Sequence, residues 1–202
     1  MAIADRKERE FKRREEDIIQ AAFDLFAEHG IDCVTIEMIA EKAEVGKGTI
    51  YKHFISKNDI FAVLIIRQGH ELIELLSSVP KDAPVLVQIK KTMRVFWDMQ
   101  VKDIRKFAVY RKCDQLILMD DMAPDVLIQF EKQSTMKTQF LRSLIKRAIE
   151  EQIFRDESVD NLMAAAVGLF QGVFDTVLAG EVRPTEELYL LLESMVFKGF
   201  MR

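Results

Sequence analysis

A short run of hydrogen-bonding and cationic side chains lies between residues 45 and 57. It contains Thr49, Tyr51, Lys52 and His53, and it contains no carboxylate. Hydroxyl, phenol, ammonium and imidazole groups can all reach phosphate oxygens or the edges of bases. The run therefore predicts a contact with a polyanion, for which double-stranded DNA is the first candidate.

Apolar spacing assigns this run to the second helix of a helix-turn-helix, over roughly residues 45–54. Ile50 and Phe54 are four apart and face inward together, so the polar side chains lie off that stripe. Gly46 and Gly48 permit a tight turn before the helix, and small residues there let the backbone approach DNA closely. Thr35 is the expected N-cap of the preceding helix, with or without a phosphate contact of its own.

A first amphipathic helix, from about Glu8 to His29, supplies the surface on which these two short helices pack. Gly30 follows it as the expected left-handed stop. Together the three helices form a small module with one inward apolar set: Ile18, Ala22, Leu25, Phe26, Ile36, Ile39, Ala40, Ala43, Val45, Ile50 and Phe54.

The overall charge of the chain argues mildly against DNA binding, because it is −4 over 202 residues. Local charge matters more than this average, since a small basic patch can dock on phosphates. A second such patch lies in the N-terminal arm, which contains Arg6, Lys7, Arg9, Lys12, Arg13 and Arg14. Interspersed acidic residues leave two interpretations of the arm open, a DNA contact and a solvated charge run.

The rest of the chain also has helical periodicity. A long fourth helix is predicted from Ser56 to about Ser77. Two prolines, at 80 and 84, then interrupt the helical structure. Further helices are expected near 84–100, 102–112, 121–151, 158–179 and 184–200. No strand alternation is evident, so the predicted fold class is all-α, with about nine helices.

Residues 35–61, TIEMIAEKAEVGKGTIYKHFISKNDIF, strongly resemble the DNA-binding motif of the TetR (tetracycline repressor) family. The resemblance covers about the first 60 residues motif by motif. The remaining residues resemble the family only in their number and in their helical character. It implies a DNA-binding domain at 1–56, a ligand-binding and dimerisation domain at 57–202, and a phosphate contact by Lys57. The residues expected at DNA are Thr35, Gly46, Lys47, Gly48, Thr49, Tyr51, Lys52, His53 and Lys57.

The resemblance also implies a cavity for a small-molecule effector in the middle helices. Residues 92–140 are rich in aromatics and methionines, which can line an adaptable apolar pocket or simply fill the core. The predicted wall, in which polar groups would orient the ligand, consists of Trp97, Phe107, Tyr110, Arg111, Gln115 and Gln133.

The stretch from Leu162 to Leu178 is apolar nearly all round, more than one face of a monomer would need. It falls short of a membrane span, so we expect a buried helix and no membrane partner. Together with the last helix, this apolar stretch predicts a homodimer and hence a roughly palindromic operator. The alternative is that the stretch packs only within its own chain. The predicted interface is Met163, Val167, Phe170, Phe174, Leu188, Leu192 and Met195.

Other classes of function find little support in the sequence. No Ser/His/Asp set, phosphate-binding glycine loop, metal motif or cofactor signature is present, and Cys33 and Cys113 are far apart. The first residues carry no secretory signal, so the expected location is the cytoplasm. We predict a repressor that leaves DNA when a ligand tilts the fourth helix; a helical adaptor or sensor that does not bind DNA is the alternative.

Overall fold

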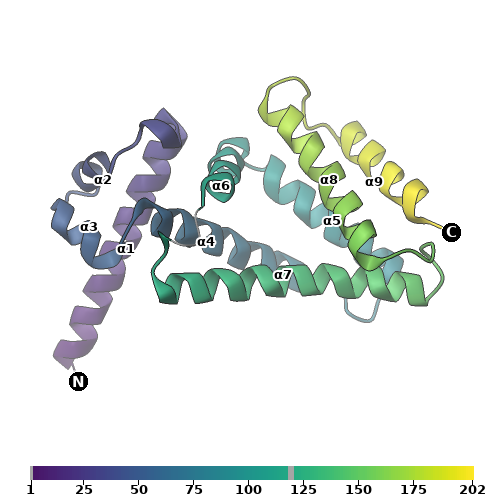
Figure 1. Cartoon of the computed structure of the whole chain (residues 1–202), viewed down its shortest axis with the longest axis horizontal. Helices are drawn as coiled ribbons and strands as arrows, with labels where there is room; N and C mark the ends of the chain where they lie inside the picture. Colours follow the sequence, from purple (N-terminus) through teal and green to yellow (C-terminus); the bar gives the residue numbers. More distant parts are fainter. Residues whose placement is uncertain (1, 118–120) are drawn as a thin grey trace. The chain divides into compact units, whose positions relative to one another are not determined.

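The computed structural model describes residues 2–117 and 121–202, with side chains from Arg6 onward, and most of these residues are helical (Figure 1). No strand occurs in these two ranges, which confirms the predicted all-α class with nine α-helices. The helices are α1 (Ala2–His29), α2 (Ile36–Lys42), α3 (Lys47–His53), α4 (Lys57–Ser77), α5 (Val85–Val101), α6 (Ile104–Leu116), α7 (Pro124–Glu150), α8 (Val159–Leu178) and α9 (Glu186–Phe200), with a 3-10 turn, η1, at Ile31–Cys33.

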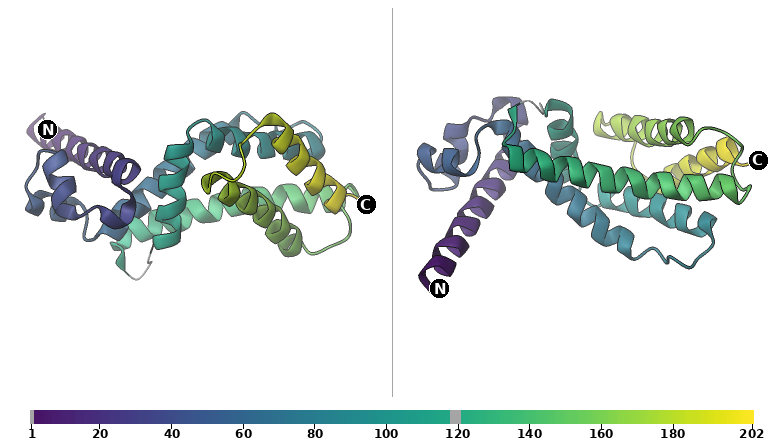
Figure 2. Two further views of the ribbon diagram at one scale, coloured as in Figure 1. Left: turned by 90° about the horizontal axis from the view of Figure 1, so that it is seen from above. Right: turned by 60° about the horizontal axis from the view of Figure 1, so that its bottom comes forward.

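The helices group into two compact units. Unit 1 consists of Met1–Gln68 and Arg105–Lys132, and unit 2 consists of Gly69–Ile104 and Gln133–Arg202. Helices α4 and α7 therefore contribute residues to both units, and Figure 2 shows the same helices from two further sides. The domain boundary between 56 and 57 stays a prediction of the sequence.

The core of unit 1 is the three-helix module expected from the sequence. Ile18, Ala22 and Phe26 of α1 are buried together with Ile39 of α2 and Ile50 of α3. Helix α4 and helix α6 close the same core from outside the module. Their buried contributions are Ile60, Phe61 and Leu64 from α4, and Val109, Tyr110 and Cys113 from α6.

Two of the predicted local signals are confirmed, and the turn between α2 and α3 has a feature that the sequence did not predict. The Thr35 hydroxyl accepts a hydrogen bond from the backbone N–H of Met38 at 3.3 Å, as an N-cap should. Gly30 ends α1 with a φ of 80°. In the turn between α2 and α3, however, the left-handed residue is Glu44, with a φ of 53°, whereas Gly46 has a φ of −71°.

Replacing Glu44 with glycine should therefore stabilise the protein. A left-handed conformation strains any residue with a Cβ, and removing that strain outweighs the extra freedom of glycine in the unfolded chain. We expect the free energy of unfolding in urea to rise by about 0.5–1 kcal/mol. The matched control, Glu41→Gly inside α2, should lower it by about 1 kcal/mol. A loss at position 44 would contradict the argument.

Helix α1 begins six residues earlier than expected, so the basic arm is part of a helix. Glutamate, lysine and arginine are strong helix formers, and Glu8 and Lys12 form an ion pair of 3.0 Å one turn apart. The sequence prediction missed this because residues 6–17 contain almost no apolar side chain from which a helical face can be recognised.

Trp97 of α5, in unit 2, is only 2% exposed. Its ring lies 5.2 Å from that of Phe174 on α8 and 5.6 Å from that of Tyr189 on α9. Ser158 and Thr185 cap these two helices by accepting hydrogen bonds from the backbone N–H groups of Asn161 and Leu188. The rings of Trp97, Phe174 and Tyr189 thus bring helices α5, α8 and α9 into contact.

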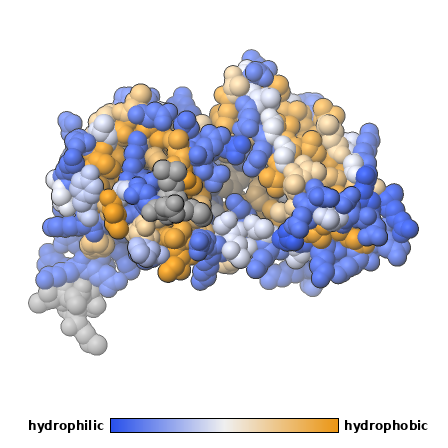
Figure 3. All heavy atoms as spheres, in the orientation of Figure 1, coloured by the Kyte–Doolittle hydropathy of each residue, from blue (hydrophilic) through white to orange (hydrophobic). Residues whose placement is uncertain are grey.

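Helix α8 is much less buried than its composition predicts. It is long and apolar enough to cross a membrane by length and composition alone, yet only 17% of its most apolar window is buried. The expectation of a buried helix is therefore wrong for the single chain. On the face seen in Figure 3, apolar side chains gather over α8 and α9. The large apolar side chains that are exposed on these two helices include Val167, Leu190, Leu191 and Met195.

Candidate DNA interface

Helix α3 presents two distinct sides, as the sequence predicts. Ile50 is 0% exposed and Phe54, directly after the helix, is 2% exposed, so both anchor it to the core of unit 1. Tyr51 is 49% exposed and Lys52 is also exposed. Among the described residues Lys52 forms no ion pair, so its ammonium is available to a phosphate.

Lys47, at the start of α3, already has a partner. Its ammonium forms an ion pair with Glu37 of α2 and lies 5.9 Å from the centre of the Tyr51 ring. The hydrogen bond between the two side chains lowers the pKa of Glu37 and raises that of Lys47. The carboxylate of Glu37 therefore lies beside the start of α3, although the run from 45 to 57 contains no carboxylate.

His53 lies at the other end of α3 and packs against α1. Its ring is stacked on that of Phe11, with centroids 3.9 Å apart and planes 28° from parallel. Burial lowers the pKa of His53, and the charge of Glu15 partly opposes that effect. At pH 7 the uncharged imidazole is therefore favoured over the imidazolium.

Lys57 has an internal role that sequence reasoning missed. Its ammonium donates to the backbone carbonyls of Ile31 and Val34, at 2.6 and 2.7 Å, and so ties the start of α4 to η1. Burial lowers its pKa, while the nearby Asp32 raises it. Two of its three N–H donors are used in this way, and the predicted phosphate contact stays a prediction.

A buried carboxylate joins the beginning of α4 to the beginning of α7, within unit 1. Asp59 is 0% exposed and accepts hydrogen bonds from the backbone N–H groups of Ile55 at 2.7 Å and Ala123 at 2.8 Å. Beside it the Ser56 hydroxyl donates to the carbonyl of Asp121 at 2.8 Å. This connection holds the loop before α7 against the end of the helix-turn-helix.

The six residues predicted to line an effector cavity do not all belong to one unit. Trp97 and Gln133 lie in unit 2, where both are buried, at 2% and 8% exposure. The other four belong to unit 1: Phe107, Tyr110, Arg111 and Gln115. Tyr110 is part of the unit 1 core, with its ring 5.9 Å from that of Phe23. A ligand contact by these residues stays a prediction.

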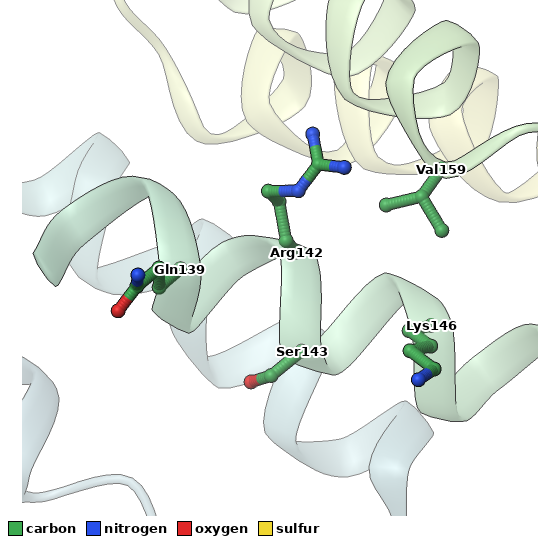
Figure 4. A pocket seen from close by; sticks show the side chains of 5 residues that line it. All are labelled: Gln139, Arg142, Ser143, Lys146 and Val159. Carbon is green, nitrogen blue, oxygen red and sulfur yellow. The ribbon is translucent and has the colours of Figure 1, made fainter. Parts of the chain in front are cut away.

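A shallow hollow of about 260 Å³ lies on α7 and at the start of α8, in unit 2 (Figure 4). It is lined by Gln139, Arg142, Ser143, Lys146 and Val159. Arg142 reaches toward α8 and forms an ion pair with Asp160, so its charge is already compensated. None of the predicted wall residues lines this hollow.

The residues predicted for the dimer interface separate into two groups. Phe174 and Leu192 are each 1% exposed and belong to the interior of unit 2. Val167 is 37% exposed and Met195 is 51% exposed. The remaining three are partly buried: Met163, Phe170 and Leu188. Exposed apolar side chains therefore remain on both α8 and α9.

Possible metal-ligating side chains are scattered over the part of the chain that the structure describes. No group of three or more His, Cys, Asp or Glu side chains is placed there to hold an ion. Cys33 is exposed, whereas burial raises the pKa of Cys113 to about 12, so the buried thiol stays protonated.

Known proteins resemble this chain in the sequence of the three-helix module and in the fold. Residues 18–64 match the family model for bacterial regulatory proteins, tetR family. The "Probable acrEF/envCD operon repressor" of Escherichia coli is 27% identical over 179 residues, covering 85% of this chain and 79% of that protein. The fatty acid degradation regulator FadR from Bacillus halodurans aligns with a TM-score of 0.70 at 20% identity, covering 90% and 93% of the two chains. A flavonoid-responsive regulator, FrrA, aligns with 0.64 at 21% identity, covering 94% and 98%.

Proposed function

Because the chain belongs to the tetR family of bacterial regulatory proteins, we propose that it represses transcription by placing α3 in the major groove of a palindromic operator. As a member of that family it is a DNA-binding transcriptional regulator. Repression is suggested by the Escherichia coli relative, which is named as an operon repressor. A regulator of this kind works in the cytoplasm, where the DNA is.

The observation that carries this proposal is the outward side of α3. Tyr51 and Lys52 are exposed, and Gly46 and Gly48 have open space where a Cβ would be. Neither glycine has a positive φ. Because no local strain or crowding requires them, their small size is best explained by the close approach of DNA to the backbone.

Replacing Gly48 with alanine should stabilise the fold but weaken operator binding. Alanine is the better helix former and meets no neighbour there, so the free energy of unfolding should rise by up to about 1 kcal/mol. The added methyl group should nevertheless weaken operator binding about tenfold by holding the backbone away from DNA. Binding can be followed by fluorescence anisotropy on duplexes selected from a random library by the protein itself.

Two outcomes would contradict the proposal. One is a Gly48→Ala variant that binds as tightly as the wild type. The other is a wild-type protein that enriches no duplex, which would favour the alternative of a helical adaptor. Ser134→Ala, at an exposed site on α7, is the control and should leave DNA binding unchanged.

We also propose that two copies of the chain associate through α8 and α9. Gly168 and Gly172 are four apart on the exposed side of α8, and a Cβ on either would meet nothing within 4 Å. Another helix can therefore approach closely there. A twofold pairing would bring two α3 helices to two half-sites of one operator.

The effector is proposed to be a small, largely apolar molecule that binds the chain's second half. Two neighbours of the same fold carry names that refer to fatty acid degradation and to flavonoids. A ligand can release DNA only if it binds the DNA-free state more tightly, so the two affinities are reciprocally linked. Unchanged operator affinity at saturation would reject any given ligand. We assign the chain no enzymatic role.

A further inference from the structure

Phe11 is the one large apolar side chain in a charged stretch of α1. It is 47% exposed, and Ile18, seven residues later, is 0% exposed. Seven residues make about two helical turns, so both side chains lie along the same face of α1. The apolar seam of the unit 1 core therefore continues outward along α1 as far as Phe11.

At this point the seam meets the last residue of α3. The Phe11 ring stacks on the His53 imidazole at 3.9 Å. Nδ1 of His53 is buried and has no hydrogen-bond partner among the described residues. Ring packing rather than a hydrogen bond therefore holds the imidazole, and Nε2 is the nitrogen left for a ligand.

Helix α3 needs such support because it is only seven residues long. Helices of this length are marginal in isolation, so tertiary contacts decide how well their ends are ordered. Ile50 and Phe54 anchor the inward side of α3. Phe11 adds a contact on the side that carries a predicted DNA-binding residue.

We propose that Phe11 is a positioning residue for DNA binding, whose ring fixes the His53 imidazole at the end of α3 with Nε2 presented to a phosphate or a base edge. The proposal rests on the proposed function. It gives the helical extension of α1 a role other than direct charge pairing with DNA.

The stack also determines how binding depends on pH. Glu15 of α1 is the charged group that acts on His53, and burial of the ring outweighs it, so the pKa lies below the ordinary 6.5. An uncharged imidazole donates one hydrogen bond and displaces no counterion. Between pH 8 and pH 6, operator affinity of the wild type should therefore change less than that of a variant in which the ring is not buried in this way.

The first test uses the free protein and no DNA. NMR titration of the His53 ring should give a midpoint below 6.5 in the wild type and a midpoint shifted toward 6.5 in Phe11→Ala. Phe11→Tyr keeps a stacking ring and should behave as the wild type does. An unchanged midpoint in Phe11→Ala would overturn the proposal, whatever the protein does with DNA.

The second test measures binding to the selected duplexes. At pH 8, Phe11→Ala should weaken binding by about threefold to tenfold, the range expected for loss of an aromatic stack. At pH 6 its freed imidazole is protonated to a greater extent than that of the wild type, so its affinity should recover. The plot of log association constant against log salt concentration should then steepen by up to about 0.9. In a His53→Ala background, Phe11→Ala should have no further effect.

The two proposals fail in different ways. Equal binding by Phe11→Ala and wild type at both pH values, or additive effects of the two alanine substitutions, would overturn the role of Phe11. Absence of any enriched duplex for the wild type would instead overturn the proposed function, and the NMR titration would still decide whether the ring controls His53. Far-UV circular dichroism of each variant establishes that the helices are retained.

Discussion

Replacing Leu191 and Met195 with arginine should produce a monomer that has lost most of its operator affinity. Both side chains are more than half exposed in the single chain, at 57% and 51%, so the substitutions disturb no internal packing. In a twofold interface they would bring like charges together. Loss of the second half-site should weaken binding by at least about 100-fold.

The control for this experiment adds the same charge elsewhere in unit 2. Leu75→Arg with Val87→Arg places two arginines on α4 and α5, at sites 41% and 39% exposed. This variant should remain a dimer and bind DNA normally in sedimentation and anisotropy measurements. A Leu191/Met195 variant that stays dimeric, or a monomer that binds with full affinity, would refute the proposed assembly.

Asp59→Ala should cause the largest loss of stability among the substitutions considered. It removes the acceptor of two backbone N–H groups, those of Ile55 and Ala123, at a site that is 0% exposed. Hydrogen bonds to a charged group are stronger than neutral ones, and the two donors would be left unsatisfied. We expect the free energy of unfolding to fall by about 3–5 kcal/mol.

Urea unfolding followed by far-UV circular dichroism measures this effect. Asp59→Asn keeps one carbonyl acceptor and should lose less than Asp59→Ala. Asp17→Ala, at an exposed site on α1, should change the free energy of unfolding by no more than about 0.5 kcal/mol. A loss below about 1 kcal/mol for Asp59→Ala would mean that water replaces the carboxylate without strain.

The inward side of α3 was predictable because local spacing determines it. Ile50 and Phe54 are four apart, so any helix through them presents Tyr51 and Lys52 elsewhere. The ion pair between Lys47 and Glu37 was not predictable, because it depends on how α2 crosses α3. Lys57 is a similar case, since its carbonyl partners lie more than twenty residues away in the chain.

The second half of the chain was harder to predict for a different reason. Helix α8 is apolar on nearly every side, so periodicity cannot tell which side faces its own chain. Phe174 proved to be internal and Val167 exposed, although both fit the same apolar pattern. Tyr110 likewise joins the core of unit 1 because its ring packs near Phe23 of α1, a tertiary contact that no local pattern encodes.

The aromatic contact around Trp97 has a spectroscopic consequence. The chain has a single tryptophan, and it lies in unit 2 within 5.6 Å of the Tyr189 ring centre. Its indole is shielded from water, so its emission should lie toward the blue, and light absorbed by Tyr189 should reach it by resonance energy transfer. Quenching of that emission would report ligand entry near α5, α8 and α9 without any attached dye.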